Sequence, residues 1–137
     1  MTAGKSEDIG KLLLRISVGF VLILHGYFKI LHGVDWLKAP LAEIGLPGFI
    51  AYGVYIGEFI APLMLILGYR IRIAAPLIMI NMIVAIYMFH RNQIFSIKEA
   101  GGGWAIELDA LILLGALAMF FLGGGKFCIK GGNGYWD

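Results

Sequence analysis

The chain has 137 residues, of which 60% are hydrophobic and only 15% are charged, with a mean hydropathy of +0.86. Soluble domains have about 45–50% apolar and about 25% charged residues, so this composition excludes a soluble enzyme and a disordered tail and indicates a protein embedded in lipid. The formal net charge of +2 gives no sign of nucleic-acid binding.

Four apolar stretches follow one another along the chain, each close to the roughly 20 residues that a membrane helix needs. We expect spans at about residues 9–31, 49–67, 71–89 and 104–122. Basic residues precede the first stretch, as in a signal peptide, but no small-residue cleavage site follows it, so this helix is predicted to be retained. The expected fold is all-α: one integral membrane domain over residues 1–137, a four-helix bundle made of two helical hairpins.

Between the first two spans, residues 35–45 form a segment too short to cross a bilayer. Pro40 limits the length of a helix here, and Gly45 can end it. We expect a short helical piece that lies at the membrane interface or re-enters the membrane.

Basic residues predict the orientation, because cytoplasmic loops of membrane proteins carry an excess of Lys and Arg. An even number of spans places both termini on one side, and that side holds most of the basic residues: Lys5, Lys11, Arg70, Arg72, Lys126 and Lys130. The other side holds Lys38, Arg91 and Lys98. Both termini are therefore predicted to be cytoplasmic.

Ionisable residues within spans are costly and usually face the bundle interior or a cavity. Five of them, from three helices, lie at one depth near the outer face: His25, Lys29, His90, Glu107 and Asp109. This convergence predicts one outward-facing polar cluster. Two alternatives without a functional site stay open: Lys29 can snorkel to the headgroups, and His90 can be an ordinary interfacial residue.

Glu58 lies near the middle of the second span, too deep for a short side chain to reach water. Gly53 and Gly57 form a GxxxG pattern that lets a neighbouring helix approach. Pro62 has no N–H to donate to the carbonyl group of residue 58, which is therefore left free. We expect a polar spot with a deep proton acceptor, or, in the alternative, a neutral Glu58 that bonds to Asn81 and only fixes helix packing.

The first helix carries one continuous stripe at three- and four-residue steps, made by Arg15, Gly19, Leu22, Gly26 and Lys29. The two glycines indicate close helix contact along this stripe. Since an unpaired buried charge is very unfavourable, we expect a Lys29–Glu107 or a His25–Glu58 pair. Arg15, near the cytoplasmic end, has two expected arrangements: it snorkels to the headgroups, or, as one basic end of the stripe, it points into the bundle.

Several kinds of site have no sequence pattern here. The chain has no HExxH, Walker loop, GxSxG or CxxC motif, so no metal site is predicted, and its single cysteine, Cys128, is expected to be a bystander. His25 and His90 could in principle ligate a heme, but both lie near the outer surface and nothing else favours a porphyrin.

Five short motifs together resemble the DoxX family of small membrane proteins. They are G-Y-F-K at 26–29, E-I-G-L-P at 43–47, G-E-F-I-A-P at 57–62, L-G-Y-R at 67–70 and G-G-G at 123–125, where the family commonly has proline in the middle of the last motif. The resemblance covers nearly the whole chain. Lys29 and Glu58 match family positions, whereas the other candidates come from their depth alone.

The resemblance implies a four-helix, multi-pass protein of the bacterial inner membrane. The family takes its name from subunits associated with a terminal quinol oxidase and with thiosulfate:quinone oxidoreduction. We therefore expect a redox-associated subunit that binds a quinone-like or other small apolar ligand, with electrons supplied by a redox partner subunit. Whether the chain is itself an enzyme stays open.

Two alternatives belong to other classes of function. One is a structural or assembly partner without chemistry, whose polar residues only fix helix packing. The other is a small proton-coupled carrier with Glu58 and Asn81 at its midplane, which would need to act as a homodimer because four spans are few for a transporter.

Overall fold

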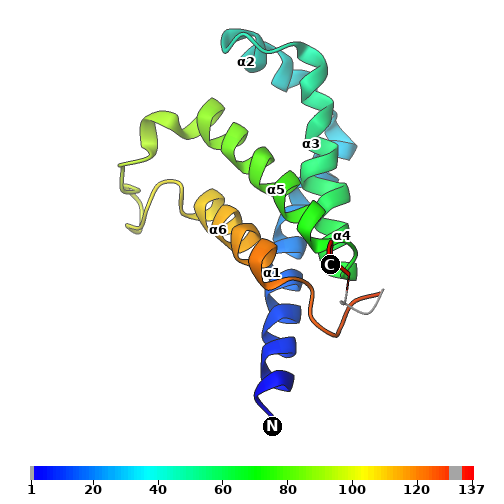
Figure 1. Cartoon of the computed structure of the whole chain (residues 1–137). Helices are drawn as coiled ribbons and strands as arrows, with labels where there is room; N and C mark the ends of the chain where they lie inside the picture. The colour runs from blue at the N-terminus through cyan, green and yellow to red at the C-terminus, as the bar shows by residue number, and fades with distance from the viewer. Residues whose placement is uncertain (1, 130–133) are drawn as a thin grey trace.

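The computed structural model describes residues 2–129 and 134–137; Lys130, one of the basic residues in the predicted orientation, lies outside them. Helices are the regular secondary structure of the described residues, whose only β-type pairing is an isolated bridge between Ile97 and Trp104. The long elements are α1 (Ala3–His32), α4 (Ala61–Leu67), α5 (Ile71–Ala85) and α6 (Glu107–Leu122). Shorter α-helical and 3₁₀ pieces are η1 (Asp35–Leu37), α2 (Lys38–Glu43), η2 (Gly48–Tyr52), α3 (Gly53–Tyr55) and η5 (Arg91–Gln93), and two π-helical turns are η3 (Ile56–Ile60) and η4 (Ile86–His90) (Figure 1).

Three continuous helical stretches are long and apolar enough to cross a membrane: Ala3–His32, Gly48–Leu67 and Ile71–Gln93. They correspond to the first three predicted spans. The fourth predicted span is also helical, but α6 begins at Glu107 and has 16 residues. At about 1.5 Å per residue it is roughly 24 Å long, shorter than the ~30 Å hydrocarbon core of a bilayer.

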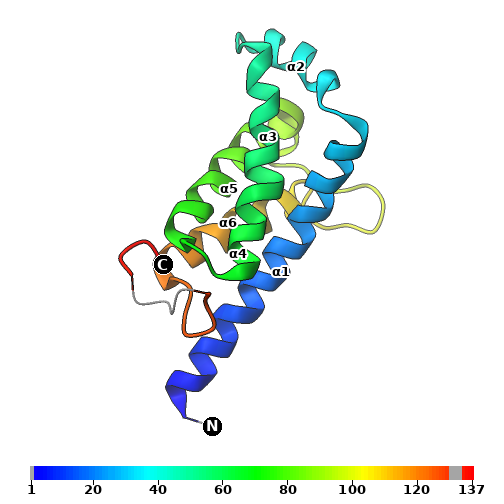
Figure 2. The same ribbon diagram turned by 90° about the vertical axis from the view of Figure 1, so that its right-hand side faces the viewer.

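The long helices pack side by side around one apolar core. α5 lies along α6, and α1 lies along η3 and α4. Leu22, Leu65, Ile78 and Met119, one from each long helix, are buried together at the centre. Both chain ends lie at the same end of the molecule, and α2 lies at the opposite end (Figures 1 and 2).

Glycines let these helices approach closely at three of the four predicted positions. A Cβ on Gly26 would collide with the backbone carbonyl oxygen of Glu58, the group that Pro62 leaves without a donor. A Cβ on Gly57 would lie 2.5 Å from the Asn81 side chain, and one on Gly19 would lie 2.7 Å from Ile66.

The fourth predicted packing glycine behaves differently. Gly53 has nothing within 4 Å of its Cβ position, so the expectation that it packs against a neighbouring helix was wrong. The buried Pro62 follows the π-helical turn η3. Proline has no backbone N–H for a helical hydrogen bond, and the π-helical turn, with its extra residue, ends two residues before it in the chain.

Arg15 does not snorkel to the surface; its side chain points into the protein, which is the second of the two expected arrangements. Its side chain is 1% exposed. The guanidinium donates to the carbonyl oxygens of Gly124 (2.8 Å) and Phe127 (2.6 Å) and to Sγ of Cys128 (2.8 Å). The tail after α6 thus folds back over the inner part of α1, where its carbonyl groups solvate the charge in place of water. Cys128 is accordingly part of a buried contact and not a bystander.

Residues 34–52, here called the cap segment, fold over one end of the helices. Val34, Leu37, Leu41 and Ala51 bury their side chains together and pack against Val54, Tyr55 and Met88. The segment is helical over η1 and α2, as predicted. On its exposed side Lys38 pairs with Asp35 (2.6 Å), and this hydrogen bond raises the pKa of the Lys38 ammonium above its ordinary value.

Candidate functional site

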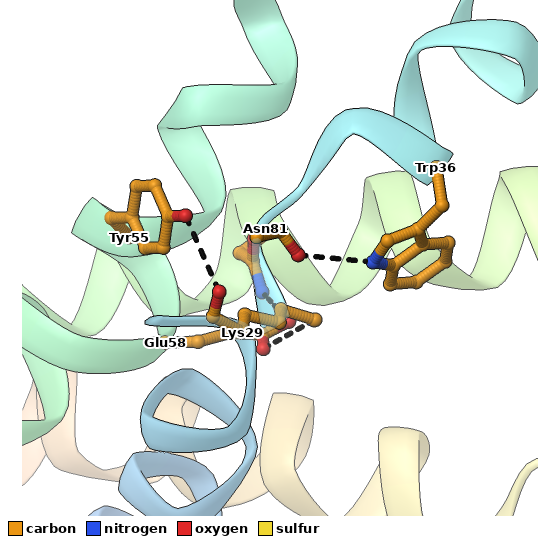
Figure 3. A network of polar contacts seen from close by, with 6 residues as sticks. Lys29, Trp36, Tyr55, Glu58 and Asn81 are labelled. Atoms are coloured by element: carbon orange, nitrogen blue, oxygen red, sulfur yellow. Dashed lines mark hydrogen bonds and ion pairs between the residues drawn. The ribbon is translucent and has the colours of Figure 1, made fainter. Parts of the chain in front are cut away.

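Three polar side chains from three helical elements meet near the middle of the protein; we call them the polar triad. The Lys29 ammonium of α1 pairs with Oε2 of Glu58 in η3. Nδ2 of Asn81 in α5 donates to Oε1 of the same carboxylate at 3.0 Å. Figure 3 shows the three side chains converging from their separate helices. Both carboxylate oxygens of Glu58, which is only 4% exposed, are therefore satisfied.

Local structure explains why these groups meet. Gly26 allows α1 to approach the backbone of η3, and Lys29 then lies three residues further along the same face. The π-helical turn turns Glu58 towards both α1 and α5, and Gly57 leaves room for Asn81. π-Helical turns occur frequently at functional sites.

The end of α1 is held by two aromatic residues. The Tyr55 hydroxyl donates to the carbonyl oxygen of Lys29 (3.3 Å), and the Trp36 indole N–H donates to the carbonyl oxygen of Gly33 (3.2 Å) (Figure 3). These contacts fix the backbone that carries Lys29. Neither residue is among the site candidates predicted from the sequence; the signal for Tyr55 is that it precedes Glu58 by three positions on one helical face.

The polar triad lies in the wall of a cavity of about 270 Å³. The rest of the lining is apolar and comes from the cap segment, from α3 and η3, and from α5 and η4; it includes Leu37, Ile56, Ile80, Val84 and Phe89. An apolar hollow with a few convergent polar groups is the usual form of a small-molecule site.

The remaining predicted residues do not join this cavity. His90 Nε2 pairs with Asp109 Oδ2 at 3.4 Å, and Glu107, the first residue of α6, pairs with Lys98 in the loop that precedes α6. His25 is exposed and makes no polar contact among the described residues. The predicted single cluster was therefore wrong. Of its five members, only His90 and Asp109 pair with each other, Lys29 belongs to the polar triad, Glu107 pairs with Lys98, and His25 stays apart.

Both predicted ion pairs were also wrong, for geometric reasons. Lys29 pairs with Glu58 and not with Glu107, because the loop with the Ile97–Trp104 bridge brings Lys98 to Glu107 instead. His25 immediately precedes the buried Gly26, and successive helical residues are about 100° apart around the axis. Its ring therefore lies beside the helix contact and does not reach Glu58.

No three His, Cys, Asp or Glu side chains gather closely enough to hold a metal ion within residues 2–129 and 134–137. What the polar triad offers is different: a partly buried ammonium that can donate hydrogen bonds, beside a carboxylate and an amide, facing an apolar space. This arrangement suits an uncharged ligand with a hydrogen-bond acceptor.

The comparison with known families decides the relationship that the motifs predicted. The DoxX family profile matches residues 10–91. The chain belongs to the DoxX family. All three members of the polar triad, Lys29, Glu58 and Asn81, lie within the matched DoxX region, whereas α6 and the tail that covers Arg15 lie outside it.

This DoxX chain is similar in sequence to a protein of Bacillus subtilis (strain 168) named "Putative oxidoreductase CatD". The two are 35% identical over 119 residues, which cover 87% of this chain and 83% of the relative. No solved structure matches the chain.

Proposed function

We propose that this DoxX protein is a redox-associated membrane subunit that binds a quinone-like ring compound in the cavity beside the polar triad. One observation carries the proposal: an ammonium–carboxylate–amide group, with the carboxylate buried and the other two partly buried, lies in the wall of an otherwise apolar cavity large enough for a ring. The name of the Bacillus subtilis relative supports a redox role.

The chemistry of a quinone matches these groups. A quinone is a flat apolar ring with carbonyl acceptors, and the Lys29 ammonium has three N–H donors, one of which is used on Glu58. Reduction to a quinol consumes two electrons and two protons. Lys29 and Glu58 can exchange these protons as general acid and base. A partner redox protein supplies the electrons in this proposal.

We also propose how the chain lies in the membrane. The four long helices form one domain of two hairpins in the bacterial inner membrane, with α6 as a short fourth span and both termini in the cytoplasm. The common position of the termini and the basic residues near them support this orientation. A helix shorter than the bilayer is accommodated by local thinning of the lipid.

Binding of a quinone to the purified protein tests the proposal. We expect decylubiquinone to bind the protein in detergent, and Lys29→Met and Glu58→Gln each to weaken binding by roughly tenfold or more, as expected for loss of a hydrogen bond to a charged donor or of the group that orients it. Lys98→Met is the matched control, because it removes the lysine of an exposed Lys–Glu pair. Asn81→Leu adds a variant that keeps the ion pair.

Each variant is first checked for its unfolding temperature, so that binding is compared among folded proteins. Absence of quinone binding to the wild-type protein, or equal binding by all the variants, would overturn the proposal.

One observation favours a second candidate, a structural or assembly role without chemistry. Both oxygens of Glu58 are already bonded within the protein, so the polar triad is complete without a ligand. In that case the variants lower stability, and no quinone protects any of them against unfolding.

A further inference from the structure

The cavity beside the polar triad has two long walls and a roof. One wall is α3 with η3, the other is α5 with η4, and the cap segment lies over the outer end with Leu37, Leu41 and Ala51. Those three cap residues are buried, so the roof is packed where it meets the cavity. An opening to the outside of the protein therefore lies where the lining residues are exposed.

The exposed lining residues lie on the two walls and are all apolar. Ile56 of η3 is 45% exposed and Ile80 of α5 is 61% exposed, and Gly53 and Phe89 are the exposed members nearer the cap segment. Each wall thus contributes two of these exposed residues, and we call the four of them the rim of the cavity. The cavity therefore opens between η3 and α5.

The depth of this rim decides what it faces. Ile56 lies near the middle of the membrane-spanning stretch Gly48–Leu67, and Ile80 near the middle of Ile71–Gln93. The hydrocarbon core occupies the middle of a span, so the opening meets lipid tails and not water. This differs from the outward-opening site that the sequence led us to expect.

The size of the cavity limits what it can enclose. Its volume of about 270 Å³ lies just below the usual range of small-molecule pockets, which is roughly 300–1,000 Å³. A single ring fits beside Lys29, but a long hydrocarbon chain does not. The chain of such a molecule would pass between Ile56 and Ile80 into the bilayer, where apolar groups have favourable surroundings on every side.

We infer that the ligand enters sideways from the bilayer between Ile56 and Ile80, and that it is a lipid-soluble molecule with a hydrogen-bond-accepting ring and a hydrocarbon tail. The ring accepts from the free N–H groups of Lys29, and the tail stays in the lipid. This inference rests on the proposed function, because it takes the polar triad as the binding site for the ring.

The test uses the full chain reconstituted in lipid nanodiscs and two probes with the same ring. Decylubiquinone has a tail, whereas ubiquinone-0 has none. Ile80→Trp and Ile56→Trp place a bulky side chain at the rim. Ile83→Trp and Ile60→Trp are matched controls, because these isoleucines are exposed on the same two helical stretches but do not line the cavity.

We expect decylubiquinone to bind roughly tenfold or more tightly than ubiquinone-0, and Ile80→Trp or Ile56→Trp to slow its association by a similar factor, since both affinity and access depend on this opening. The two control variants should associate at the wild-type rate. Equal affinity for the two probes, or equal slowing by rim and control variants, would overturn the inference.

The variants of the polar triad separate this inference from the function on which it rests. If Lys29→Met abolishes binding while the rim variants associate at the wild-type rate, the ring site stands and sideways entry is wrong. If decylubiquinone binds equally well to wild type and Lys29→Met, its binding does not depend on a hydrogen bond from the polar triad to the ring, and both proposals fail. If the wild-type protein binds neither probe, both fail as well.

Discussion

The ammonium group of Lys29 and the carboxylate of Glu58 form an ion pair that joins α1 to η3 inside the protein. Their side chains are 15% and 6% exposed. A second Lys–Glu pair, between Lys98 and Glu107, joins the loop that precedes α6 to the start of that helix, with side chains 43% and 50% exposed. The chain therefore contains a buried and an exposed example of the same pair, which makes their energetic difference measurable.

Loss of Lys29 should cost far more stability than loss of Lys98. Lys29→Met leaves the Glu58 carboxylate buried without its counter-charge, and breaking a buried pair in this way costs about 3–5 kcal/mol. Lys98→Met removes an exposed pair, worth about 0–1 kcal/mol. The free energy of unfolding in detergent micelles measures both. Adding Glu58→Met to Lys29→Met should recover part of the loss, and equal losses for the two single variants would contradict the prediction.

Gly26→Ala should separate α1 from η3. The new Cβ would collide with the carbonyl oxygen of Glu58, which is backbone and cannot rotate away. Overpacking of this kind costs about 1–3 kcal/mol, and we expect a lower unfolding temperature. Gly10→Ala is the control, because a Cβ there meets nothing within 4 Å. In a helix, alanine is favoured over glycine by up to about 1 kcal/mol, so this variant should be unchanged or more stable. A stable Gly26→Ala would show that the helices are not in contact here.

Arg15→Met should release the tail from α1. Arg15 donates three hydrogen bonds to the tail, one of them to Sγ of Cys128. Without them the tail opens more often, and local opening governs how fast a buried group reacts. We expect the rate of maleimide labelling of Cys128, the only cysteine, to rise by roughly tenfold. Lys5→Met, an exposed change on the same helix, should leave the rate unaltered. Equal rates in both variants would mean that the tail is held by other contacts.

The side of the membrane on which Cys128 lies tests the orientation. With both termini in the cytoplasm, a membrane-impermeant maleimide should label Cys128 in inverted membrane vesicles and not in intact spheroplasts. A Cys128→Ser/Phe95→Cys variant should show the opposite pattern, because Phe95 is fully exposed in the loop between η5 and α6. Labelling of both cysteines from the same side would contradict an even number of spans.

The positions of the helices along the chain could be predicted well, and the polar contacts between them only in part. Depth and residue type were enough to select Glu58, Lys29 and Asn81, and the contact between Glu58 and Asn81 had been considered as an alternative. The partner of Lys29 was predicted incorrectly, because depth does not say which way each helix is rotated about its axis. Arg15 illustrates the same limit, since its position on the stripe with Gly19 and Gly26 indicates an inward side chain, but no local pattern reveals that the tail carbonyl groups receive it.

By itself, the sequence determined the membrane environment, the helical segments and the membership of the DoxX family, because hydropathy and short motifs are properties of consecutive residues. Only the tertiary structure decided that Lys29, Glu58 and Asn81 form one group, that His90 and Glu107 belong to other pairs, and that the apolar cavity opens at the depth of Ile56 and Ile80. The physical reason is that a hydrogen bond needs polar atoms within about 3 Å of each other. That distance is set by the contact at Gly26 and Gly57 and by the π-helical turn at Glu58, which depend on how whole helices pack.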